Sequence, residues 1–488
     1  MAANLADAIA RNAADRPSDE ALVEVTEGGR SALTWRELDA AVDAAARALD
    51  DLGLVAGQRV MIIGHNRIDT VLALFGALRG GLVAVPTNPG LSDNELRRIV
   101  AHSGAAVVLS DTGFEPVGEH PPHSLPLAGL GDRATSAQAS VRGPLDSEAL
   151  AALVYTAGTS GQPKGVMLTH RAMLAYCRSS AELGLADGTA RVLAVLPLFH
   201  IYGLNAVLGG ALEVGATTVL LDGMPDDTAA VLTAERISHL ALTPSALYRL
   251  SAEDGLVDAS GGLRLVTSGA APLPRALAEH FERLTGAVVE QGYGLTEAAP
   301  GISTTFGHPQ LGPGHVGRAI PGVELRIGDG SDPQDPGNLH VRGANLFSGY
   351  WPDGSGGPDS DGWFDTGDVG YLRGDDLFLV DRSRELVIVS GFNVYPTEIE
   401  ELLESHESVT EAAVIGQPDE RTGERVVAFL AGPAVRPEQV RRFCAEHLAR
   451  YKVPREFLVL KKLPRSATGK IRKGALRDLL DRSEEREQ

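Results

Sequence analysis

The chain has 488 residues, too many for one ordinary domain, and its apolar fraction of 43% and charged fraction of 22% are those of globular proteins. Its 44 basic and 64 acidic residues leave a net charge of −20, which argues against nucleic acid or anionic lipid as the main partner. Cys177 and Cys444 form neither a disulfide framework nor a zinc-binding pattern, so we expect the reducing cytoplasm. Met1–Arg16 lacks the pattern of a secretory signal, and Arg79 and Glu213 interrupt the longest apolar runs, so no transmembrane segment is predicted.

The first block of predicted elements alternates strands with helices. Thr34 and Glu37 have the spacing of a capping box, which predicts a helix from there to Leu52. Strands are then predicted at Arg59–Ile63, Leu82–Pro86 and Ala105–Leu109, and helices at Thr70–Leu78 and Ser92–His102. Such alternation is typical of a doubly wound parallel sheet. The stretch Thr112–Pro144 is rich in Gly, Pro and Ser and is predicted to be a surface loop.

A second alternating block follows, and the pattern then changes twice. The elements predicted in this block are helices at Thr169–Ala181, Leu204–Val214 and Asp227–Arg236 and strands at Arg191–Leu196, Thr217–Leu221, His239–Leu242, Leu263–Thr267 and Ala287–Gln291. After Pro321, short strands between turns predict a small β-barrel. From about Glu385 we expect a compact α+β unit. The predicted fold class is therefore α/β, with two doubly wound subdomains and a small barrel in a large N-terminal domain and a small, mobile α+β C-terminal domain.

The segment between the apolar stretches Ala151–Val154 and Val166–Thr169 has the composition of a phosphate-binding loop. Glycines let the backbone present N–H groups to an anion, hydroxyl groups add donors, and Lys164 adds a positive charge. The segment is not a P-loop, because Pro163 precedes the lysine and Gly165 follows it. Its composition alone would equally suit a hairpin or a flexible loop.

The stretch Tyr155–Gly165 resembles the signature loop of the adenylate-forming superfamily, which includes acyl-CoA synthetases, firefly luciferase and peptide-synthetase adenylation domains. It departs from the usual pattern Y-T-S-G-T-T-G-x-P-K-G at Ala157 and at Ser160, of which Ser160 keeps a hydroxyl group. Further motifs follow in the order of that family, and the resemblance covers about Thr34–Leu480. It implies ATP, Mg²⁺ and coenzyme A, together with a small-molecule carboxylic acid as the partner.

Three motifs of the N-terminal part would each be ordinary structure if taken alone. Pro197–Gly203 suits the end of a core strand, Thr267–Pro272 suits a tight turn, and Trp363–Asp368 places Asp368 at a predicted turn. The segment Gln291–Glu297 is more informative, because it offers an aromatic face, glycines and the oxygen ligands that Mg²⁺ prefers.

The C-terminal motifs point to a mobile domain. Asp381–Glu385 matches the family's domain junction, with an arginine at the hinge position 384, where the family usually has Lys or Asp. Ser390–Glu400 closely resembles fatty acyl-CoA ligases. Arg450–Lys473 is a basic stretch. It has two interpretations: a solvent-exposed charged face, or an anchor for the phosphates of ATP or CoA. Within this stretch Pro464–Ile471 matches the P-x-x-x-T-G-K motif.

The resemblance assigns roles residue by residue. The implied catalytic residues are Lys470, Thr156, Lys164, Glu297 and His200, with Thr156 and Glu297 as the metal ligands. The implied nucleotide and CoA contacts are Thr156, Gly158, Thr159, Ser160, Gly161, Lys164, Gly269, Ala270, Ala271, Gln291, Gly292, Tyr293, Gly294, Thr296, Asp368, Arg382, Ser390, Gly391 and Phe392. The implied acyl pocket consists of His200, Tyr202, Asn205, Ser268, Gly292, Gly294 and Pro300. The hinge is Arg384, within 382–384, between domains 1–381 and 385–488.

The expected activity is that of an ATP-dependent acyl-CoA synthetase for a medium- or long-chain fatty acid. An aryl acid such as a coumarate is the runner-up, and an enzyme that loads a carrier protein, a luciferase-like oxidase and a non-enzymatic nucleotide sensor are the rivals. Retention of Lys470, Glu297 and Asp368 together speaks against the sensor. The sequence does not determine the length of the acyl chain or the metabolic pathway, and a homodimer is compatible with it.

Overall fold

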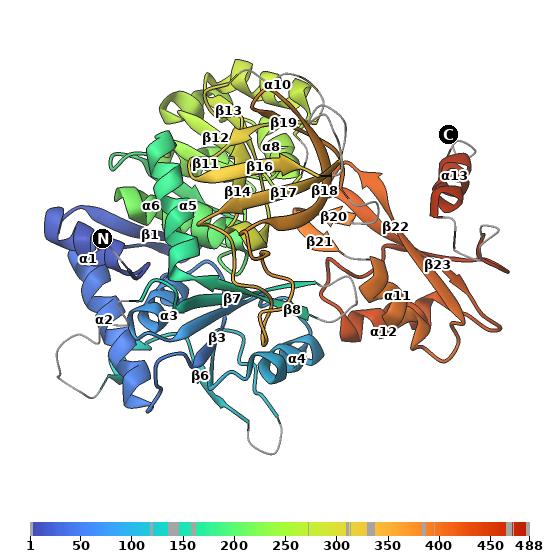
Figure 1. Ribbon diagram of the computed structural model, residues 1–488, viewed down its shortest axis with the longest axis horizontal. Helices are drawn as coiled ribbons and strands as arrows, with labels where there is room; N and C mark the ends of the chain where they lie inside the picture. Colours follow the sequence, from blue (N-terminus) through green and yellow to red (C-terminus); the bar gives the residue numbers. More distant parts are fainter. Residues whose placement is uncertain are drawn as a thin grey trace. The chain divides into compact units, whose positions relative to one another are not determined.

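The computed structural model describes residues 3–117, 121–134, 146–157, 163–271, 273–308, 312, 314–328, 337–382, 387–394, 396–464, 471 and 473–484. The chain forms two compact units (Figure 1). The larger consists of Met1–Pro89, Ile99–Thr156 and Gly165–Asp381, and the smaller of Gly90–Arg98, Ala157–Lys164 and Arg382–Gln488. Across the described residues, no helix has both the length and the apolar character that a membrane span requires.

The first sheet of the larger unit has six strands in the order β6-β5-β3-β4-β7-β8. Their bounds are β3 (Arg59–Ile63), β4 (Val83–Thr87), β5 (Val107–Ser110), β6 (His123–Pro126), β7 (Leu150–Ala157) and β8 (Pro163–Thr169). Strands β3 to β7 run parallel, as the alternation of elements predicts. The helices of this part are α1 (Asp7–Asp15), α2 (Trp35–Asp51) and α3 (Ile68–Arg79), and α4 (Asp93–Ser103) begins in the segment Gly90–Arg98 of the smaller unit.

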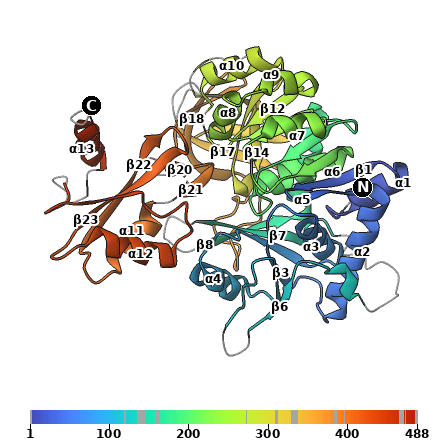
Figure 2. The same cartoon turned by 180° about the vertical axis from the view of Figure 1, so that it is seen from behind.

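The start of α2 confirms the predicted capping box. The Thr34 hydroxyl accepts from the Glu37 backbone N–H, and the Glu37 carboxylate accepts from the Thr34 backbone N–H. These reciprocal bonds satisfy two N–H groups that would otherwise lack partners at the helix end. The helix packs on α3, which in turn packs on β3 and β4 (Figure 2). Within Thr112–Pro144, predicted as a loop, the structure adds strand β6 and a 3₁₀ turn at Gly131–Arg133.

The second sheet has parallel strands from β1 to β13, and the edge strand β2 pairs antiparallel with β1. In the order of the sheet, its first strands are β2 (Gly29–Thr34), β1 (Glu20–Thr26), β10 (Thr217–Leu220), β9 (Arg191–Ala194), β11 (His239–Leu242), β12 (Leu265–Ser268) and β13 (Val288–Gly294). Successive side chains of β9 belong to two different hydrophobic cores. Leu193 is in the same core as Val219 and Phe281, whereas Ala194 is in the same core as Leu220. Two buried faces are typical of parallel sheets with helices on both sides.

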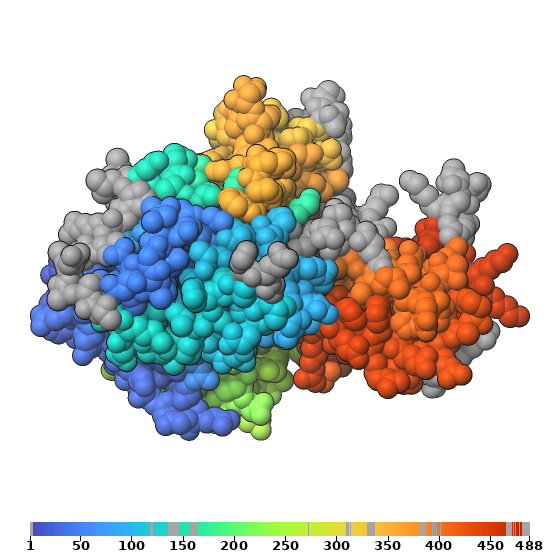
Figure 3. Space-filling model, turned by 90° about the horizontal axis from the view of Figure 1, so that it is seen from below, coloured from blue at the N-terminus to red at the C-terminus, as the bar shows by residue number. Residues whose placement is uncertain are grey.

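Helices cover both faces of this second sheet. They are α5 (His170–Leu183), α6 (Gly210–Val214), α7 (Thr228–Ala234), α8 (Pro244–Ser251), α9 (Leu256–Ala259) and α10 (Arg275–Thr285). The helix predicted at Leu204–Val214 differs from the expectation, because Tyr202–Gly209 is a π-helix that runs directly into α6. A π-helical turn is often found at a functional site. Figure 3 shows the face of the larger unit that is built mainly from the N-terminal residues, coloured blue to cyan.

An antiparallel region extends the second sheet where the sequence predicts a small barrel. It joins the parallel strands through the pairing of β13 with β14 and curves strongly in Figure 1. Its strands are β14 (Gly301–Thr304), β15 (His315–Ala319), β16 (Val323–Ile327), β17 (Gly337–Gly343), β18 (Phe364–Arg373) and β19 (Asp376–Arg382). The region therefore starts before Pro321, the residue at which the sequence pattern changes.

The smaller unit is α+β, as the sequence predicts. Its sheet has the order β21-β20-β23-β22, with β24 beside β23. The bounds are β20 (Val387–Val389), β21 (Phe392–Val394), β22 (Glu411–Asp419), β23 (Gly423–Ala431), β24 (Glu456–Val459), α11 (Pro396–Glu404), α12 (Pro437–His447) and α13 (Lys473–Glu484). Cys444 is buried in its core and Cys177 in that of the larger unit, and both are free thiols.

Candidate functional site

The larger unit gathers the predicted N-terminal site residues at the carboxyl ends of adjacent strands. Strands β9, β11, β12 and β13 are parallel neighbours, and Ser268 at the end of β12 lies opposite Gln291 in β13. His200 and Tyr202 follow β9, Gly269 follows β12, and Tyr293 ends the same edge on β13. Ligands of open α/β sheets bind in the crevice outside the carboxyl ends of the strands, so this edge is the candidate site.

His200 is held as a neutral imidazole. Its Nδ1 accepts a hydrogen bond from the Tyr202 backbone N–H at 3.2 Å, and burial lowers the pKa of the imidazole to about 4. Because Nδ1 is an acceptor, the ring proton is on Nε2 at neutral pH. His200 can therefore donate one hydrogen bond to a carboxylate, but it does not supply a positive charge.

Tyr202 forms part of the wall beside His200. Its hydroxyl donates to the Thr267 backbone carbonyl at 3.2 Å, which fixes the ring across the end of β12. A Cβ built on Gly269 would lie 3.0 Å from the Tyr202 ring, so glycine is needed for this close approach. The neighbouring Ser268 hydroxyl is buried and has no hydrogen-bond partner among the described residues. An unsatisfied buried hydroxyl beside an aromatic wall is a natural contact point for a polar ligand atom.

Asn205, which is predicted to line the acyl pocket, has hydrogen-bond partners within the protein. It is completely buried in the π-helix, and its amide donates to the backbone carbonyls of Met173 and Ala299 at 3.1 and 2.7 Å. Its carbonyl accepts from the thiol of Cys177 at 3.4 Å. The polar atoms of Asn205 are therefore bonded within the protein. This arrangement holds α5, the π-helix and the Ala299 segment together.

The stretch from Gly292 to Pro300 folds back on itself tightly. A Cβ on Gly294 would collide with the backbone carbonyl of Pro300, and that carbonyl accepts from the Leu295 N–H at 2.9 Å. The following Gly301 has the Tyr176 ring in the place that a Cβ would occupy. Tyr176, on α5, was not predicted as a site residue, because helical periodicity in the sequence marks it only as core.

Asp368 and Tyr293 form a directly bonded pair. The Tyr293 hydroxyl donates to Asp368 Oδ2 at 2.5 Å, and both side chains are buried, with exposed fractions of 5% and 7%. The prediction that Asp368 lies at a turn is wrong, because Asp368 lies within β18. The turn-like sequence Thr366-Gly367 reflects a positive φ at Gly367 within that strand. The resemblance to nucleotide-binding enzymes thus coincides with a real contact between two distant strands.

Glu297 lies in a 3₁₀ turn, Thr296–Ala298, just beyond β13. Its Oε1 accepts from the Tyr350 hydroxyl at 2.8 Å, a partner that the sequence did not reveal. No cluster of three or more His, Cys, Asp or Glu side chains suited to a metal ion occurs in the described part of the chain. Mg²⁺ is usually held by one or two protein oxygens together with phosphate oxygens, and the Glu297 carboxylate is an oxygen ligand of that kind.

The two flanks of the signature loop are joined by a packed cluster. Trp351 donates its backbone N–H to the Gly165 carbonyl at 2.8 Å and its indole N–H to the His102 carbonyl at 2.9 Å. The Tyr155 hydroxyl lies 2.8 Å from His102 Nδ1, and a Cβ on Gly165 would be 3.2 Å from the Tyr155 ring. We call Tyr155, Gly165, Trp351 and His102 the flank cluster.

The structure describes only some of the predicted site residues. Gly158, Thr159, Ser160, Gly161, Arg384 and Lys470 lie outside the described residues. Thr156 is the last residue but one of β7 and belongs to the larger unit, Lys164 lies in β8 in the smaller unit, and Arg382 is the last residue of β19. Gly269, Ala270, Ala271, Gln291 and Thr296 all fall on the strand-end edge of the larger unit.

The predicted CoA-contacting segment of the smaller unit is a tight hairpin. Val389 pairs with Phe392, so Ser390 and Gly391 form a two-residue turn in which both φ angles are positive, 52° and 84°. This is the backbone geometry of the turns that best match the twist of a hairpin. The Phe392 ring stacks on Tyr451, with centroids 4.4 Å apart. The hairpin is therefore anchored by its aromatic residue, and its turn is presented at the surface.

Comparison with known proteins agrees with this geometry. The family model of the AMP-binding enzymes matches residues 9–351, and that of their C-terminal domain matches residues 398–470. A long-chain-fatty-acid–CoA ligase of Salmonella typhimurium is 32% identical, covering 91% of this chain and 90% of that protein. An indoleacetate–CoA ligase of Aromatoleum aromaticum is 34% identical, covering 92% and 94%.

A solved structure resembles the whole chain. A double mutant of o-succinylbenzoate CoA synthetase from Bacillus subtilis, bound to a product analogue, superposes with a TM-score of 0.85. It is 30% identical and covers 96% of this chain and 98% of its own. The chain therefore belongs to the AMP-binding enzymes of the adenylate-forming superfamily.

Proposed function

We propose that this protein is an AMP-forming acid–CoA ligase whose acid is an apolar monocarboxylic acid, first of all a medium- or long-chain fatty acid. In the first half-reaction the carboxylate attacks the α-phosphorus of ATP, and pyrophosphate leaves. In the second, the CoA thiol attacks the acyl carbon, the thioester forms, and AMP leaves. No protein nucleophile is required, because AMP is the leaving group.

The first half-reaction brings two anions together, so positive charge and hydrogen-bond donors must offset the charge that develops. Lys470 and the loop from Thr156 to Lys164 supply these groups in the proposed mechanism. Glu297 and Thr156 would hold Mg²⁺, which neutralises phosphate charge when bound. Asp368, which is hydrogen-bonded to Tyr293, is expected to accept hydrogen bonds from the ribose hydroxyl groups. The small residues Gly269–Ala271 would let the adenine ring approach the backbone.

The observation that carries the choice of acid is the composition of the three stretches matched to the family's acyl pocket. The stretches Phe199–Ala206, Ser268–Ala271 and Gly292–Ser303 contain no Lys or Arg. His200, the one residue in these stretches whose side chain could become a cation near neutral pH, has a pKa lowered to about 4 and is neutral. A second carboxylate would be buried without a partner, at a cost of several kcal/mol.

An aryl acid is the second candidate, and two aromatic contacts favour it. The Tyr202 ring lies against Gly269 and the Tyr176 ring lies against Gly301, so two tyrosine rings pack against the stretches matched to the acyl pocket. Burial raises the pKa of Tyr202 to about 12, so its hydroxyl stays protonated. Ring faces of this kind suit an offset-stacked aromatic substrate. The similarity to an indoleacetate–CoA ligase points in the same direction.

The deciding experiment is the steady-state kcat/KM for malonate, octanoate, palmitate and coumarate, scored by pyrophosphate release and repeated with CoA. Octanoate or palmitate as the best substrate supports the proposal, and coumarate as the best substrate promotes the second candidate. Malonate as the best substrate would overturn the apolar-acid proposal. If pyrophosphate is released but CoA does not accept the acyl group, the result would instead favour the thiol of a carrier protein as the acyl acceptor.

A further inference from the structure

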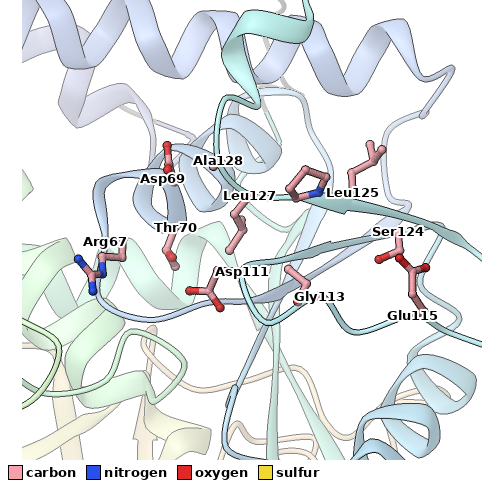
Figure 4. A pocket seen from close by; sticks show the side chains of 12 residues that line it. Arg67, Asp69, Thr70, Asp111, Gly113, Glu115, Ser124, Leu125, Leu127 and Ala128 are labelled. Atoms are coloured by element: carbon pink, nitrogen blue, oxygen red, sulfur yellow. The ribbon is translucent and has the colours of Figure 1, made fainter.

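A cavity of about 350 Å³ lies in the first sheet of the larger unit and is not used by the proposed reaction (Figure 4). Three segments line it: the start of α3 with Arg67 before it, the end of β5 with the stretch that follows, and β6 with the residues after it. The lining residues are Arg67, Asp69, Thr70, Ser110, Asp111, Gly113, Glu115, Ser124, Leu125, Pro126, Leu127 and Ala128. This volume is within the range of small-molecule sites.

The cavity lies at a topological switch point of the sheet. Strands β3 and β5 are parallel neighbours, but the chain leaves β3 toward β4 on one side and leaves β5 toward β6 on the other. The connections that follow the two strands therefore diverge and open a crevice at their carboxyl ends. In doubly wound sheets this crevice is where ligands bind. The candidate adenylation site uses the corresponding edge of the second sheet, so the first sheet has a switch point of its own.

The charged groups of this cavity leave an excess of negative charge. Arg67 is paired with Glu24 at 3.0 Å, and Asp111 accepts from both the backbone N–H and Nδ1 of His65 at 2.9 and 2.8 Å. Asp69 and Glu115, in contrast, make no hydrogen bond or ion pair with any described residue. Two carboxylates that have no partner among the described residues therefore line the cavity.

Asp69 is not explained by helix capping. It lies in the first turn of α3, but the Ile68 N–H at that helix start already donates to Glu24 Oε2 at 2.7 Å. Partial burial, together with the nearby charges of Glu24 and Asp132, raises the pKa of Asp69. A cation beside Asp69 would relieve this unfavourable environment of its carboxylate.

The two carboxylates stand at different ends of the cavity. Figure 4 shows Asp69 near Arg67 and Thr70 at one end, and Glu115 beside Ser124 at the other. Leu127 lies between these ends, and Leu125 and Pro126 contribute further apolar surface. The described residues offer no metal-binding cluster here, so the lining matches an organic cation with an alkyl body better than a metal ion.

We propose that this cavity binds a small aliphatic ammonium compound, of which an alkyl diamine is the simplest form. One ammonium group would donate to Asp69 and the other to Glu115 and Ser124, while the alkyl chain contacts Leu127 and Leu125. Charge-assisted hydrogen bonds at both ends would give the site its preference for a doubly charged ligand over a neutral one.

The test is isothermal titration calorimetry of the full-length protein with 1,4-diaminobutane, n-butylamine and 1,4-butanediol at constant ionic strength. We expect 1,4-diaminobutane to bind more tightly than n-butylamine, and 1,4-butanediol not to bind. The double variant Asp69→Asn/Glu115→Gln should weaken diamine binding at least about tenfold, since each lost bond involves a charged group. The single variant Glu115→Gln should weaken diamine binding about threefold or more. Because Glu115 is exposed, this variant tests the proposal even if the double variant does not fold.

The matched control is Asp254→Asn/Asp258→Asn, which makes the same change in net charge at two exposed residues that do not line the cavity. Diamine binding to this control should equal that of the wild type. Three results would each overturn the proposal: no binding to the wild type, equal weakening in the control, or butanediol binding as tightly as diaminobutane.

Discussion

At the scale of single residues, the pair Tyr293–Asp368 connects the second parallel sheet to the antiparallel region. The bond joins β13 and β18, which are separated by several strands in the sheet order, and both partners are buried. The tyrosine therefore orients the carboxylate before any nucleotide binds. Pre-positioned polar groups contribute more to binding than groups that must first be ordered.

We expect Asp368→Asn to raise the KM for ATP about tenfold or more, because a hydrogen bond to a charged group contributes about 1.5–3 kcal/mol. ATP–pyrophosphate exchange measures this effect directly. Asp365→Asn is the matched control, since Asp365 lies in the same strand with an exposed side chain. Equal changes in KM for the two variants would contradict a specific role for Asp368.

A second residue-scale prediction concerns the stability of the fold at acid pH. His170 is completely buried, its Nδ1 accepts from the Leu5 N–H at 3.2 Å, and burial lowers its pKa to about 4. In the unfolded chain the pKa is about 6.5, so between these values the unfolded state binds the extra proton. The free energy of unfolding should therefore fall as the pH falls from 7 to 5, by about 2 kcal/mol from this group.

Urea unfolding at pH 7 and pH 5 tests this with His170→Gln, whose amide oxygen can still accept from Leu5. The variant should lose stability between the two pH values by about 2 kcal/mol less than the wild type. His280→Gln, at an exposed residue of α10, should keep the wild-type dependence. An unchanged pH dependence in His170→Gln would show that the buried imidazole is not responsible.

At the scale of elements, the flank cluster fixes the strands on either side of the signature loop. Tyr155 lies near the end of β7, Gly165 lies in β8, and Trp351 donates hydrogen bonds to the carbonyls of Gly165 and His102. There is little room for another atom, since a Cβ on Gly165 would lie 3.2 Å from both Trp351 Cβ and the Tyr155 ring. The loop should therefore start and end at defined points even though its chemistry lies between them.

Gly165→Ala should lower the kcat/KM for ATP on the order of ten- to a hundredfold, because a small displacement of a phosphate-binding group is costly to catalysis. Gly261→Ala is the control, since no atom lies within 4 Å of the Cβ built there and its φ is not positive. The assay is again ATP–pyrophosphate exchange, with thermal unfolding to compare stability. If both variants behave alike, the contacts around Gly165 do not position the loop.

The elements that could be predicted from the sequence are those with strong local signals. The capping box at Thr34 and the apolar run Arg59–Ile63 carry their structure in their own residues, and both are confirmed. Strand β1 was missed, because its register depends on pairing with β10 across a long sequence separation. The π-helix at Tyr202–Gly209 was predicted as an ordinary helix, since no local pattern distinguishes the two.

The candidate site could be predicted where motifs carry it and not where tertiary contacts do. Glu297, Tyr293 and Asp368 were identified by motif, but the partner Tyr350 of Glu297 lies at the edge of a Gly- and Pro-rich stretch that the sequence marks only as a loop. Asn205 shows the opposite case, since a polar residue next to the motif proved to be bonded within the core. The burial of a side chain and its hydrogen-bond partners depend on the folded chain, so they cannot be predicted from one segment of the sequence.

At the scale of the whole molecule, the proposed reaction needs two different protein groups beside the same bound acyl group in turn, one for each half-reaction. Lys470 would serve adenylation, and the Ser390–Gly391 hairpin would serve thioester formation, and both belong to the smaller unit. One domain can present both only if it changes orientation between the half-reactions, as domain movements do in many enzymes. We place the pivot at Arg384 by its match to the family's hinge position.

Arg384→Pro should leave adenylation nearly intact and slow thioester formation, because proline fixes φ at the pivot and restricts rotation. Lys470→Ala should do the reverse, with a loss of about 10²–10³-fold in adenylation and little change in thioester formation from a supplied acyl-adenylate. The two half-reactions are measured separately, by ATP–pyrophosphate exchange and by acyl transfer from synthetic adenylate to CoA. Arg384→Lys is the control for the pivot, since it keeps the charge and the backbone freedom and should resemble the wild type. If pyrophosphate exchange falls first in Arg384→Pro, the pivot lies elsewhere, and if Lys470→Ala slows both half-reactions equally, the lysine does not serve adenylation alone.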